Sequence, residues 1–422
     1  MLLALRLCSL VCRVAEAQSQ SVDDAQLLLR VKSVWGDPPV LRTWNASSPG
    51  TPCTWKFVRC DKAGRVTNLT LASASRGGSI YLAGPFPEAA IGGLTALTYL
   101  DVSNNSISGA FPTTLYRCVS LRYLDLFQNN FTDTIPVSLG AQTRLRTLGL
   151  AENTFLAGEL PASFKNLTNL VSLWALQCNL VGDFPSHVLE MKQLEVLKVS
   201  NNMLNGSIPV AVWRLSKLQG LYLNGNNFTG DMVFNDFSAM SLMYIDLSEN
   251  YKLTGAIPEV FGTLKNLTLL FLSSNNFSGE IPVSIGQLPS LLVLMLANNR
   301  FTGTLPPDLG KHSGLHYVEA DYNKLTGTIP EGLCARGQFR YLTANGNQLN
   351  GSIPAGLANC PIVRYVALDD NNLSGDVPED LWMAPQLYYL SLQSNQLTGS
   401  LPAMMSSNLV TLRLGNNQFS GS

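Results

Sequence analysis

The chain has 422 residues, a net charge of −1 and 14% charged residues, well below the quarter that is usual for a soluble domain. A balance so close to neutral argues against a broad basic surface for nucleic acid or anionic lipid. The three histidines, His187, His312 and His316, are too scattered to predict a metal site. The length exceeds the usual size of one compact core, a limit that a repeat architecture escapes because it grows by adding units.

Residues 1–17, MLLALRLCSLVCRVAEA, are typical of a secretory signal peptide. Ala15 and Ala17 provide the small residues of a cleavage site, although Arg6 and Arg13 interrupt the apolar run. A start truncated upstream is the alternative. We expect a signal peptide at 1–17 and secretion, or a place on the outer face of the plasma membrane as part of a longer receptor.

Residues 18–65 are expected to form a cap that precedes the repeats. Asp23 to Trp35 predicts a short amphipathic helix with Asp23 or Asp24 as its N-cap. The apolar residues expected to face inward are Leu27, Leu28, Val31 and Val34.

From residue 66 to residue 422 a pattern of 24 residues repeats, as in LTLLFLSSNNFSGEIPVSIGQLPS at 267–290. The apolar spacing of three and then two predicts a short strand, with Leu270 and Leu272 on one side. Gly279 and Pro282 then turn the chain. We expect about 15 units, of which the last is incomplete and the first carries an insertion at Ser73 to Ser79. The regular units open at Leu97, Leu121, Leu145, Leu170, Leu194, Leu218, Leu242, Leu267, Leu291, Leu315, Phe339, Val363, Leu387 and Leu409.

An asparagine follows each strand at a fixed distance. A buried Asn must satisfy both its amide donors and its acceptor, so stacked asparagines predict an internal hydrogen-bond ladder between neighbouring coils. Cys178 takes this place in one unit, Asp133 replaces the turn glycine in another, and Gly230 begins a third departure. The predicted ladder residues are Asn105, Asn129, Asn153, Asn202, Asn226, Asn250, Asn275, Asn299, Asn323, Asn347, Asn371, Asn395 and Asn417.

At these residues the chain resembles the plant-type leucine-rich repeat, LxxLxLxxNxLxGxIPxxLGxLxx. The resemblance covers about residues 66 to 422. It implies an α/β solenoid, a right-handed superhelix with parallel strands on the concave face and an irregular or 3₁₀ convex side.

Residues 44–60 contain W-N and then C-T-W-K-F-V-R-C, which resembles the N-terminal cap of plant leucine-rich-repeat ectodomains, W-N…C-x-W-x-G-V-x-C. Phe57 stands where that pattern has Gly. Such a cap covers the apolar end and strand edge of the first coil. A disulfide between Cys53 and Cys60 would fix it, whereas a zinc site needs four ligands and finds two cysteines here.

The remaining cysteines outside the signal segment are Cys118, Cys178, Cys334 and Cys360. Cys178 is expected to be a buried free thiol. Cys334 and Cys360 occupy nearly the same phase of adjacent coils, so a disulfide between them and two free thiols are both open, because geometry decides.

N-x-S/T sequons are frequent, partly because the repeat consensus itself generates them. Asn68 is expected at the second concave position of the first coil, whereas most others fall outside the concave columns. The expected glycosylation sites are Asn45, Asn68, Asn104, Asn130, Asn166, Asn205, Asn227, Asn266, Asn276, Asn350 and Asn372.

The second and fourth residues after each opening Leu are expected to face the concave side. Aromatic side chains there point away from the core, which suggests ligand binding. For the tyrosines the alternative is that aromatic residues simply suit strands. The expected ligand contacts are Trp174, Lys198, Tyr222, Phe271, Met295, Tyr317, Glu319, Tyr341 and Tyr365, with Arg340 and Arg364 one place earlier in their strands.

A catalytic reading fares worse. His316 and Glu319 share a strand. Asp321 and Asp369 occupy equivalent positions in their repeats and are expected to lie nearby. A hydrolase needs a paired nucleophile and base, or two facing carboxylates in a pocket, and a smooth sheet excludes little water. We therefore expect no enzyme activity and no cofactor in these residues.

The cap, the 24-residue repeat and the segments around Cys334 and Cys360 are similar to the ectodomains of the HAESA-like receptor kinases, which sense small secreted peptides. In that family an Arg-x-Arg pair holds the carboxylate of the peptide; the matching positions here are Tyr365 and Ala367, so the pair is absent. Arg340 and Arg364 lie near. The resemblance implies a secreted peptide ligand and a leucine-rich-repeat kinase as co-receptor.

A secreted inhibitor of a pathogen cell-wall-degrading enzyme, like the polygalacturonase-inhibiting proteins, is the alternative function. Those proteins have about ten coils and a cysteine-closed end. The sequence shows no apolar span of about 20 residues and no kinase motif, and its last coil is open at Ser422, so we expect a fragment of a longer product. The exposed apolar side chains of that coil are expected to promote association.

Overall fold

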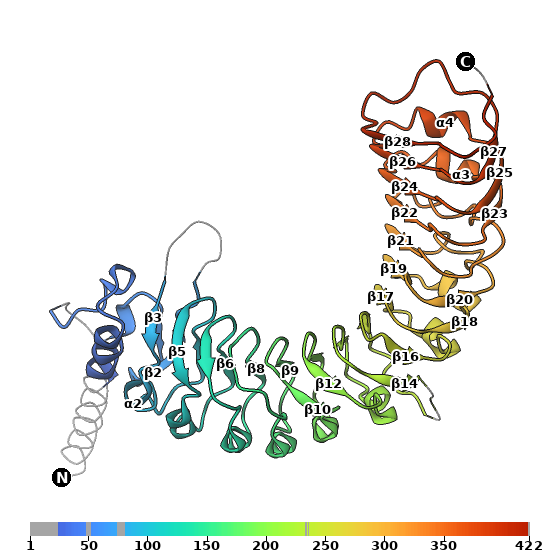
Figure 1. Ribbon diagram of the computed structural model, residues 1–422. Helices are drawn as coiled ribbons and strands as arrows, with labels where there is room; N and C mark the ends of the chain where they lie inside the picture. The colour runs from blue at the N-terminus through green and yellow to red at the C-terminus, as the bar shows by residue number, and fades with distance from the viewer. Residues whose placement is uncertain (1–23, 48–51, 74–80, 233, 235, 421–422) are drawn as a thin grey trace, which may run out of the picture. The chain divides into compact units, whose positions relative to one another are not determined.

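The computed structural model describes residues 24–47, 52–73, 81–232, 234 and 236–420, which belong to two compact units, Met1–Met203 and Leu204–Ser422 (Figure 1). The expected signal peptide at 1–17 and nearly all of the insertion at 73–79 lie outside the described residues.

The first unit is built on a sheet that follows chain order. β1 (Val58–Cys60) pairs antiparallel with β2 (Val66–Thr70), and every later neighbour is parallel. The later strands of this sheet are β4 (Tyr99–Asp101), β6 (Tyr123–Asp125), β8 (Thr147–Gly149), β9 (Ser172–Trp174) and β11 (Val196–Lys198). A smaller flank sheet holds β3 (Ala83–Pro85), β5 (Ser106–Ala110) and β7 (Asn130–Thr132), and β10 (Val181–Asp183) follows.

Short helices return the chain from one strand to the next in this unit. Most are 3₁₀ helices that begin directly after a proline, whose fixed φ suits the turn. Besides the helix over 24–34 they are η1 (Pro39–Leu41), η2 (Pro52–Thr54), α2 (Glu88–Ile91), η3 (Thr113–Arg117), η4 (Val137–Ala141), η5 (Ala162–Asn166) and η6 (Ser186–Glu190).

The second unit repeats the same plan with parallel neighbours throughout its main sheet. Its main strands are β13 (Gly220–Tyr222), β15 (Tyr244–Asp246), β17 (Leu269–Phe271), β19 (Val293–Met295), β21 (Tyr317–Glu319), β22 (Tyr341–Thr343), β24 (Tyr365–Ala367), β26 (Tyr389–Ser391) and β28 (Thr411–Arg413).

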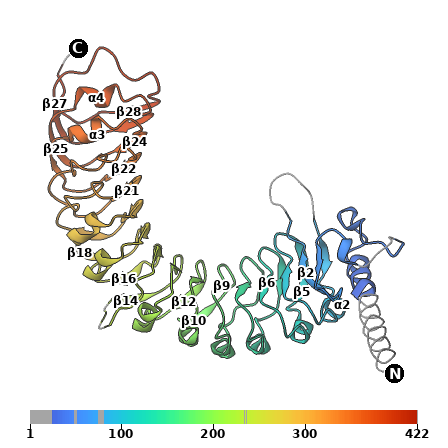
Figure 2. The same cartoon turned by 180° about the vertical axis from the view of Figure 1, so that it is seen from behind.

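The flank strands of the second unit are β14 (Thr229–Asp231), β16 (Lys252–Thr254), β18 (Ser278–Glu280), β20 (Arg300–Thr302), β23 (Asn350–Gly351), β25 (Asn372–Asp376) and β27 (Gln396–Thr398), and β12 (Met203–Asn205) begins at the end of the first unit. Its helices are η7 (Val210–Arg214), η8 (Glu259–Thr263), η9 (Val283–Gln287), α3 (Ala355–Ala358) and α4 (Glu379–Trp382). In each unit the main strands and the helices lie on opposite sides (Figure 2).

The main strands alternate as the apolar spacing predicts. In β17, Leu270 is fully buried, whereas Leu269 and Phe271 on either side of it are half-buried. The same order holds in β19 and β21. Because neighbouring strands pair residue for residue, the outward side chains line up in two columns across each unit. We call this surface the strand face; it confirms the columns expected for the concave side.

The buried asparagine ladder is confirmed. Asn250 is fully buried; its Oδ1 accepts the N–H of Phe228 (3.2 Å), and its Nδ2 donates to Leu223 O (3.1 Å) one coil back and to Leu247 O (3.0 Å) in its own coil. Each Asn therefore closes its own turn and joins it to the preceding coil. Donation to the preceding coil recurs at Asn105, Asn129, Asn153, Asn202, Asn275, Asn299, Asn323, Asn347, Asn371, Asn395 and Asn417.

Cys178 keeps only part of this pattern. Its sulfur lies 3.4 Å from Leu150 O, a weak contact, while its backbone N–H donates to Oδ1 of Asn202 (2.9 Å). It is free and buried, as expected, and Cys118 is a second buried free thiol among the described residues. Burial raises the pKa of the Cys178 thiol, so it stays protonated and inert.

The cap helix differs from the expectation at both ends. Leu28 and Val31 are buried, but Val34 is 44% exposed, and Trp35 takes the inward place, where its Nε1 donates to Pro85 O (3.1 Å). Asp24 lies within the helix rather than at its N-cap, and its Oδ2 accepts the N–H of Val66 (2.8 Å). The carboxylate thus accepts the hydrogen bond of the first N–H in the first repeat strand, β2. Asp23 lies outside the described residues.

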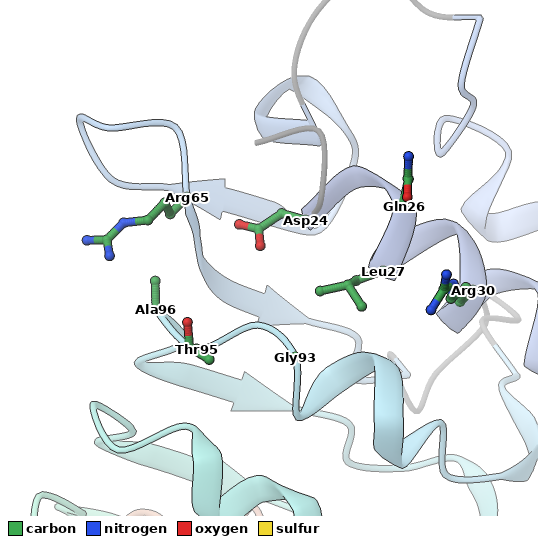
Figure 3. A pocket seen from close by; sticks show the side chains of 8 residues that line it. All are labelled: Asp24, Gln26, Leu27, Arg30, Arg65, Gly93, Thr95 and Ala96. Atoms are coloured by element: carbon green, nitrogen blue, oxygen red, sulfur yellow. The ribbon is translucent and has the colours of Figure 1, made fainter. Parts of the chain in front are cut away.

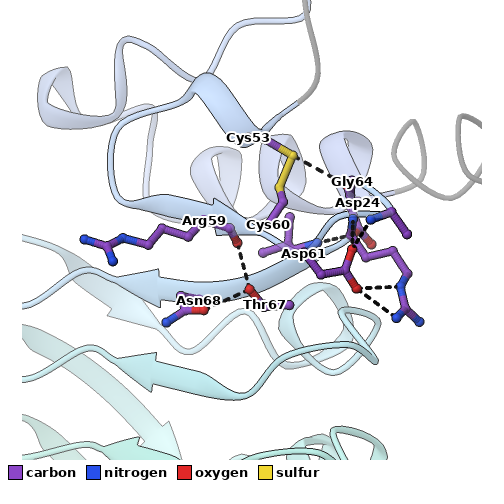
Figure 4. The surroundings of a disulfide bond; sticks show 11 residues. Asp24, Cys53, Arg59, Cys60, Asp61, Gly64, Thr67 and Asn68 are labelled. Atoms are coloured by element: carbon purple, nitrogen blue, oxygen red, sulfur yellow. Dashed lines mark hydrogen bonds and ion pairs between the residues drawn. A yellow bond between two sulfur atoms is a disulfide. The ribbon is translucent and has the colours of Figure 1, made fainter.

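The cap disulfide between Cys53 and Cys60 is confirmed, with the two Cα atoms 5.4 Å apart (Figure 4). The zinc alternative is excluded, because both thiols are used. Phe57, in place of the family glycine, has φ +71°, a conformation that Gly adopts without strain. Asp133, in place of a turn glycine, likewise has φ +62°. Both substitutions keep the backbone shape at an energetic cost.

The second cysteine pair is also joined, since Cys334 and Cys360 form a disulfide with Cα atoms 5.7 Å apart. The coil that departs from the repeat after Gly230 has a different filling. There Phe234 and Phe237 pack on Trp213 and Phe261, with ring centroids 4.9–6.3 Å apart. Between β14 and β15 the described residues form no 3₁₀ helix, and this aromatic packing fills the coil instead.

Replacing Asn250 by Ala should lower the free energy of unfolding by about 2 kcal/mol or more, because the Phe228 N–H loses the Asn250 oxygen inside the core and the Leu223 carbonyl, which also accepts from Asn226, loses one of its donors. Chemical denaturation measures the loss. Asn169→Ala, which removes an exposed side chain with a single hydrogen bond to Thr143 O, is the control and should change much less. Equal effects would contradict the ladder as a source of stability.

Loss of the Cys53–Cys60 disulfide should lower the thermal stability of the first unit. Cys53→Ser opens a short loop, so we expect a loss of a few kcal/mol at most, seen as a lower melting temperature. Cys118→Ser, which changes a free thiol, is the matched control. Free Cys53 and Cys60 thiols in mass mapping of the secreted parent would overturn the pairing.

Candidate functional site

The strand face of the second unit begins with stacked tyrosines. Tyr222 lies over Gly220, whose missing side chain leaves room for the ring, since a Cβ there would come within 2.9 Å of it. Tyr222 also stacks on Tyr244 at 6.3 Å between ring centroids. Burial raises the pKa of Tyr222, so its hydroxyl remains a donor. Gly220 therefore creates the flat aromatic start of this surface.

Phe271 and Met295 continue the second column. Phe271 pairs in register with Asp246 on one side and Met295 on the other, and Met295 pairs in turn with Glu319. All of the expected contacts in this unit are half-buried rather than freely exposed, because each leans on its neighbours in the adjacent strands. The result is a continuous apolar strip with a carboxylate at each end.

Glu319 is held in place from two directions. Its Oε1 accepts a hydrogen bond from Ser273 Oγ (3.2 Å), two coils back, and its Oε2 accepts one from Tyr317 OH (3.1 Å). Its position beside Met295 is therefore fixed before any ligand arrives.

Four tyrosines follow one another in the first column, on β21, β22, β24 and β26. Tyr317 meets Tyr341 edge to face at 5.6 Å, and Tyr365 stacks on Tyr389 at 4.1 Å and 4° between planes. Burial raises the pKa of Tyr365 to about 12, and the neighbouring Tyr389 adds to it. Sequence reasoning named Tyr317, Tyr341 and Tyr365 as contacts but omitted Tyr389, which completes the row.

The positions of the family's Arg-x-Arg pair carry no cation here. Tyr365 belongs to the tyrosine row, and Ala367 is buried with 1% exposure. In the same column as Ala367, two strands on, lies Arg413, whose guanidinium sits 5.9 Å from the Tyr389 ring centroid. Arg413 is an exposed cation on the strand face that our list of contacts missed; its place in the column was the available signal.

Arg340 and Arg364 do not lie in either column. Each precedes its strand and lies on the flank, where the Nε of Arg364 donates to Oε1 of Gln386 (3.3 Å). They therefore border the tyrosine row instead of joining it.

Trp174 and Lys198 belong to the strand face of the first unit, where they pair in register at the ends of β9 and β11. Trp174 and Asp125 both lean over Gly149, since a Cβ there would lie 3.2 Å from the indole and 2.3 Å from the carboxylate. In the same face Tyr99 stacks on Tyr123 at 4.1 Å.

The carboxylates weighed for catalysis have structural partners. Asp321 accepts from the N–H of Asn345 (2.9 Å) and from the hydroxyl of Thr343, and Asp369 accepts from Ser391 Oγ (2.7 Å) and Gln393 N (2.9 Å). Burial raises the pKa of Asp369. In the described part of the chain no group of three or more His, Cys, Asp or Glu could hold a metal.

Most of the asparagines in the sequons are exposed. Asn45, Asn130, Asn166, Asn205, Asn227, Asn266, Asn350 and Asn372 are exposed, whereas Asn68, Asn104 and Asn276 are half-buried. Asn68 pairs in register with Tyr99, so it stands in the first column and not, as expected, at the second position. Glycosylation at the eleven sites stays a prediction.

An open hollow of about 370 Å³ lies beside the cap helix (Figure 3). Asp24, Leu27, Arg30, Arg65 and Thr95 are among the residues that line it. Two of its charged groups are already engaged: Asp24 accepts from Val66, and Arg65 forms an ion pair with Asp61 at 2.8 Å. The hollow therefore lies where the cap packs on the first coil.

Comparisons with known proteins identify the family. The family model described as Leucine rich repeat matches residues 86–131, 175–228 and 240–301, and the family model described as Leucine rich repeat N-terminal domain matches residues 21–61. The crystal structure of the Arabidopsis receptor kinase HAESA ectodomain, in complex with an N-terminally extended IDA peptide hormone, is 33% identical with a TM-score of 0.80 and covers 96% of this chain and 75% of that one. The chain belongs to the leucine-rich-repeat ectodomains of plant receptor kinases.

Two further proteins are similar to this ectodomain, one in structure and one in sequence. The plant peptide hormone receptor RGFR1, solved in complex with RGF2, is 30% identical with a TM-score of 0.71 over 87% of this chain and 65% of that one. Polygalacturonase inhibitor 1 of Oryza sativa subsp. japonica is 38% identical over 111 residues, 25% of this chain and 31% of its own. The ectodomain spans between 18% and 31% of the first curated relatives that it matches. Every helix in its described residues is too short or too polar to span a bilayer.

The tyrosine row predicts a steep loss of stability in alkali. Because the pKa of Tyr365 is raised to about 12 in the folded state, against about 10 when unfolded, its contribution is complete below about pH 10 and disappears as the pH rises toward 12. Chemical denaturation at several pH values should show a shallower decline in Tyr365→Phe than in the parent. Tyr81→Phe, which removes a 67% exposed phenol, should behave as the parent does.

Proposed function

We propose that this chain is the extracellular ligand-recognition module of a plant receptor-like kinase or receptor-like protein, and that it binds a small secreted peptide across the strand face of the second unit. The observation that carries the proposal is the continuous aromatic and apolar surface from Tyr222 to Tyr389, half-buried and held in register by the sheet. A peptide-bound ectodomain, 33% identical, supports it.

The dimensions suit an extended peptide. Neighbouring strands lie about 4.8 Å apart, so the seven strands from β13 to β24 extend over roughly 29 Å. An extended chain covers that length with roughly nine residues at about 3.3 Å each. Aromatic side chains would contact the apolar parts of the peptide, because rigid rings bury area at a low entropic cost.

Charges would set the direction and register of the peptide. Glu319 offers a fixed carboxylate in the middle of the surface, and Arg413 offers an exposed cation at its far end. Arg340 and Arg364 border it on one flank. In the first unit Trp174 and Lys198 are proposed as further contacts.

A leucine-rich-repeat kinase is proposed as co-receptor. The support is a solved complex of the receptor kinase HAESA with the peptide hormone IDA and the co-receptor SERK1, one chain of which is 25% identical to this one with a TM-score of 0.56. Secretion, or exposure on the outer face of the plasma membrane, follows from the same reading and fits the two disulfides.

Inhibition of a cell-wall-degrading enzyme is the second candidate. It is favoured by the 38% identity to Polygalacturonase inhibitor 1 over 111 residues. An assay of fungal polygalacturonase with and without the chain separates the candidates, since inhibition at equimolar protein would favour the inhibitor.

Truncating Phe271 should weaken peptide binding. We expect Phe271→Ala to cost about 1–2 kcal/mol or more in isothermal calorimetry against peptides that bind the parent, because the ring lies at the centre of the strip between Asp246 and Met295. Val137→Ala removes a 69% exposed apolar side chain on a convex 3₁₀ helix and is the control. Identical affinities of parent and Phe271→Ala would place the peptide elsewhere.

A further inference from the structure

One flank of the second unit carries a stripe of basic side chains. His316, Arg340 and Arg364 directly precede β21, β22 and β24. The N–H of Arg340 donates to His316 O (3.0 Å), and the N–H of Arg364 donates to Arg340 O (2.9 Å). The three side chains therefore start from equivalent positions on adjacent strands, about 4.8 Å apart.

This stripe lacks negative charge. The four successive segments 313–317, 337–341, 361–365 and 385–389 contain no Asp or Glu. In the described part of the chain no salt bridge involves Arg340 or Arg364. The Nε of Arg340 is buried and has no hydrogen-bond partner, and that of Arg364 reaches only a neutral amide, Gln386. A buried cationic donor without an acceptor is costly, so an incoming acceptor would relieve it.

We propose that His316, Arg340 and Arg364 form a binding site for an oxyanion, the carboxylate, sulfate or phosphate group of an acidic ligand. Guanidinium groups present paired N–H donors that match such oxygens and stay charged at every physiological pH. The inference rests on the proposed function only in assigning the oxyanion to the peptide; binding of the anion itself is measured separately.

A second arginine pair shows what distinguishes this stripe. Arg122 and Arg146 occupy the same register on the first unit, with the N–H of Arg146 donating to Arg122 O (2.7 Å). Both are exposed, however, and Thr98 stands where His316 precedes the other pair. Among these four arginines, Arg340 and Arg364 are half-buried and Arg340 alone has a buried Nε without a partner, so the exposed pair provides a matched control.

His316 provides a direct readout. Burial and the charge of Arg340 lower the pKa of His316, and Leu292 on the preceding strand adds no charge. A bound oxyanion favours the imidazolium and raises that pKa. Binding is therefore tighter as the pH falls through the bound-state pKa and is independent of pH well above it.

The experiment is a nuclear magnetic resonance titration of the full chain with ¹³C-labelled histidine, which gives three signals, of which His316→Gln identifies one. Sodium sulfate is compared with sodium chloride at equal ionic strength. We expect sulfate to move the His316 midpoint up by about one pH unit. The shift should vanish in Arg340→Met/Arg364→Met and persist in Arg122→Met/Arg146→Met.

A His316 response that is absent for sulfate, phosphate and acetate alike, or equal in Arg340→Met/Arg364→Met and the parent, overturns the site. Selective response to sulfate or phosphate assigns a tetrahedral ester, and selective response to acetate assigns a carboxylate. If oxyanions bind but no peptide does in calorimetry, the proposed function fails and the site remains.

Discussion

The buried side chain of one asparagine per coil is the constraint on which the rest of the structure depends. An amide inside an apolar core must use its donors and its acceptor, and Asn250 does so by donating to its own turn at Leu247 and to the preceding coil at Leu223, and by accepting from the Phe228 N–H of that preceding coil. Coils joined in this way cannot slip against one another. The residue-for-residue pairing of the main strands follows, and with it the two outward columns.

That register converts distance along the chain into a regular surface. Residues 24 or 25 positions apart become neighbours, so Phe271 meets Met295 and Tyr365 meets Tyr389 without any loop to position them. Each side chain is half-covered by the next, which limits its rotamers before a ligand binds. Glu319, bonded to Ser273 two coils back, shows the same principle for a charge. The shape and charge of this surface are properties of the stack and not of any single repeat.

Sequence analysis predicted the features that recur with the 24-residue period, and it missed contacts that depend on residues elsewhere in the chain. The strands, the ladder and the two columns depend on spacing and were predicted from it, and the Cys53–Cys60 bond was predicted from the resemblance of the cap. Val34 and Trp35 exchanged roles because the large indole finds Pro85 O, a contact 50 residues away. Whether Cys334 meets Cys360 depended on the backbone path between coils. Tyr389 and Arg413 were visible in the columns, but their importance comes from stacking on neighbours that spacing does not describe.

The exchange of two column positions has the widest consequence. With Tyr365 and buried Ala367 at the two positions where the resemblance to HAESA-like receptors leads one to expect arginines, the centre of the late coils is aromatic, and the cations lie at Arg413 in the column and at Arg340 and Arg364 on the flank. Arg340 and Arg364 thus border the tyrosine row, whereas Arg413 lies over the Tyr389 ring at its far end. If the proposed peptide binds here, we expect it to combine an apolar segment over the tyrosines with an acidic group at their edge.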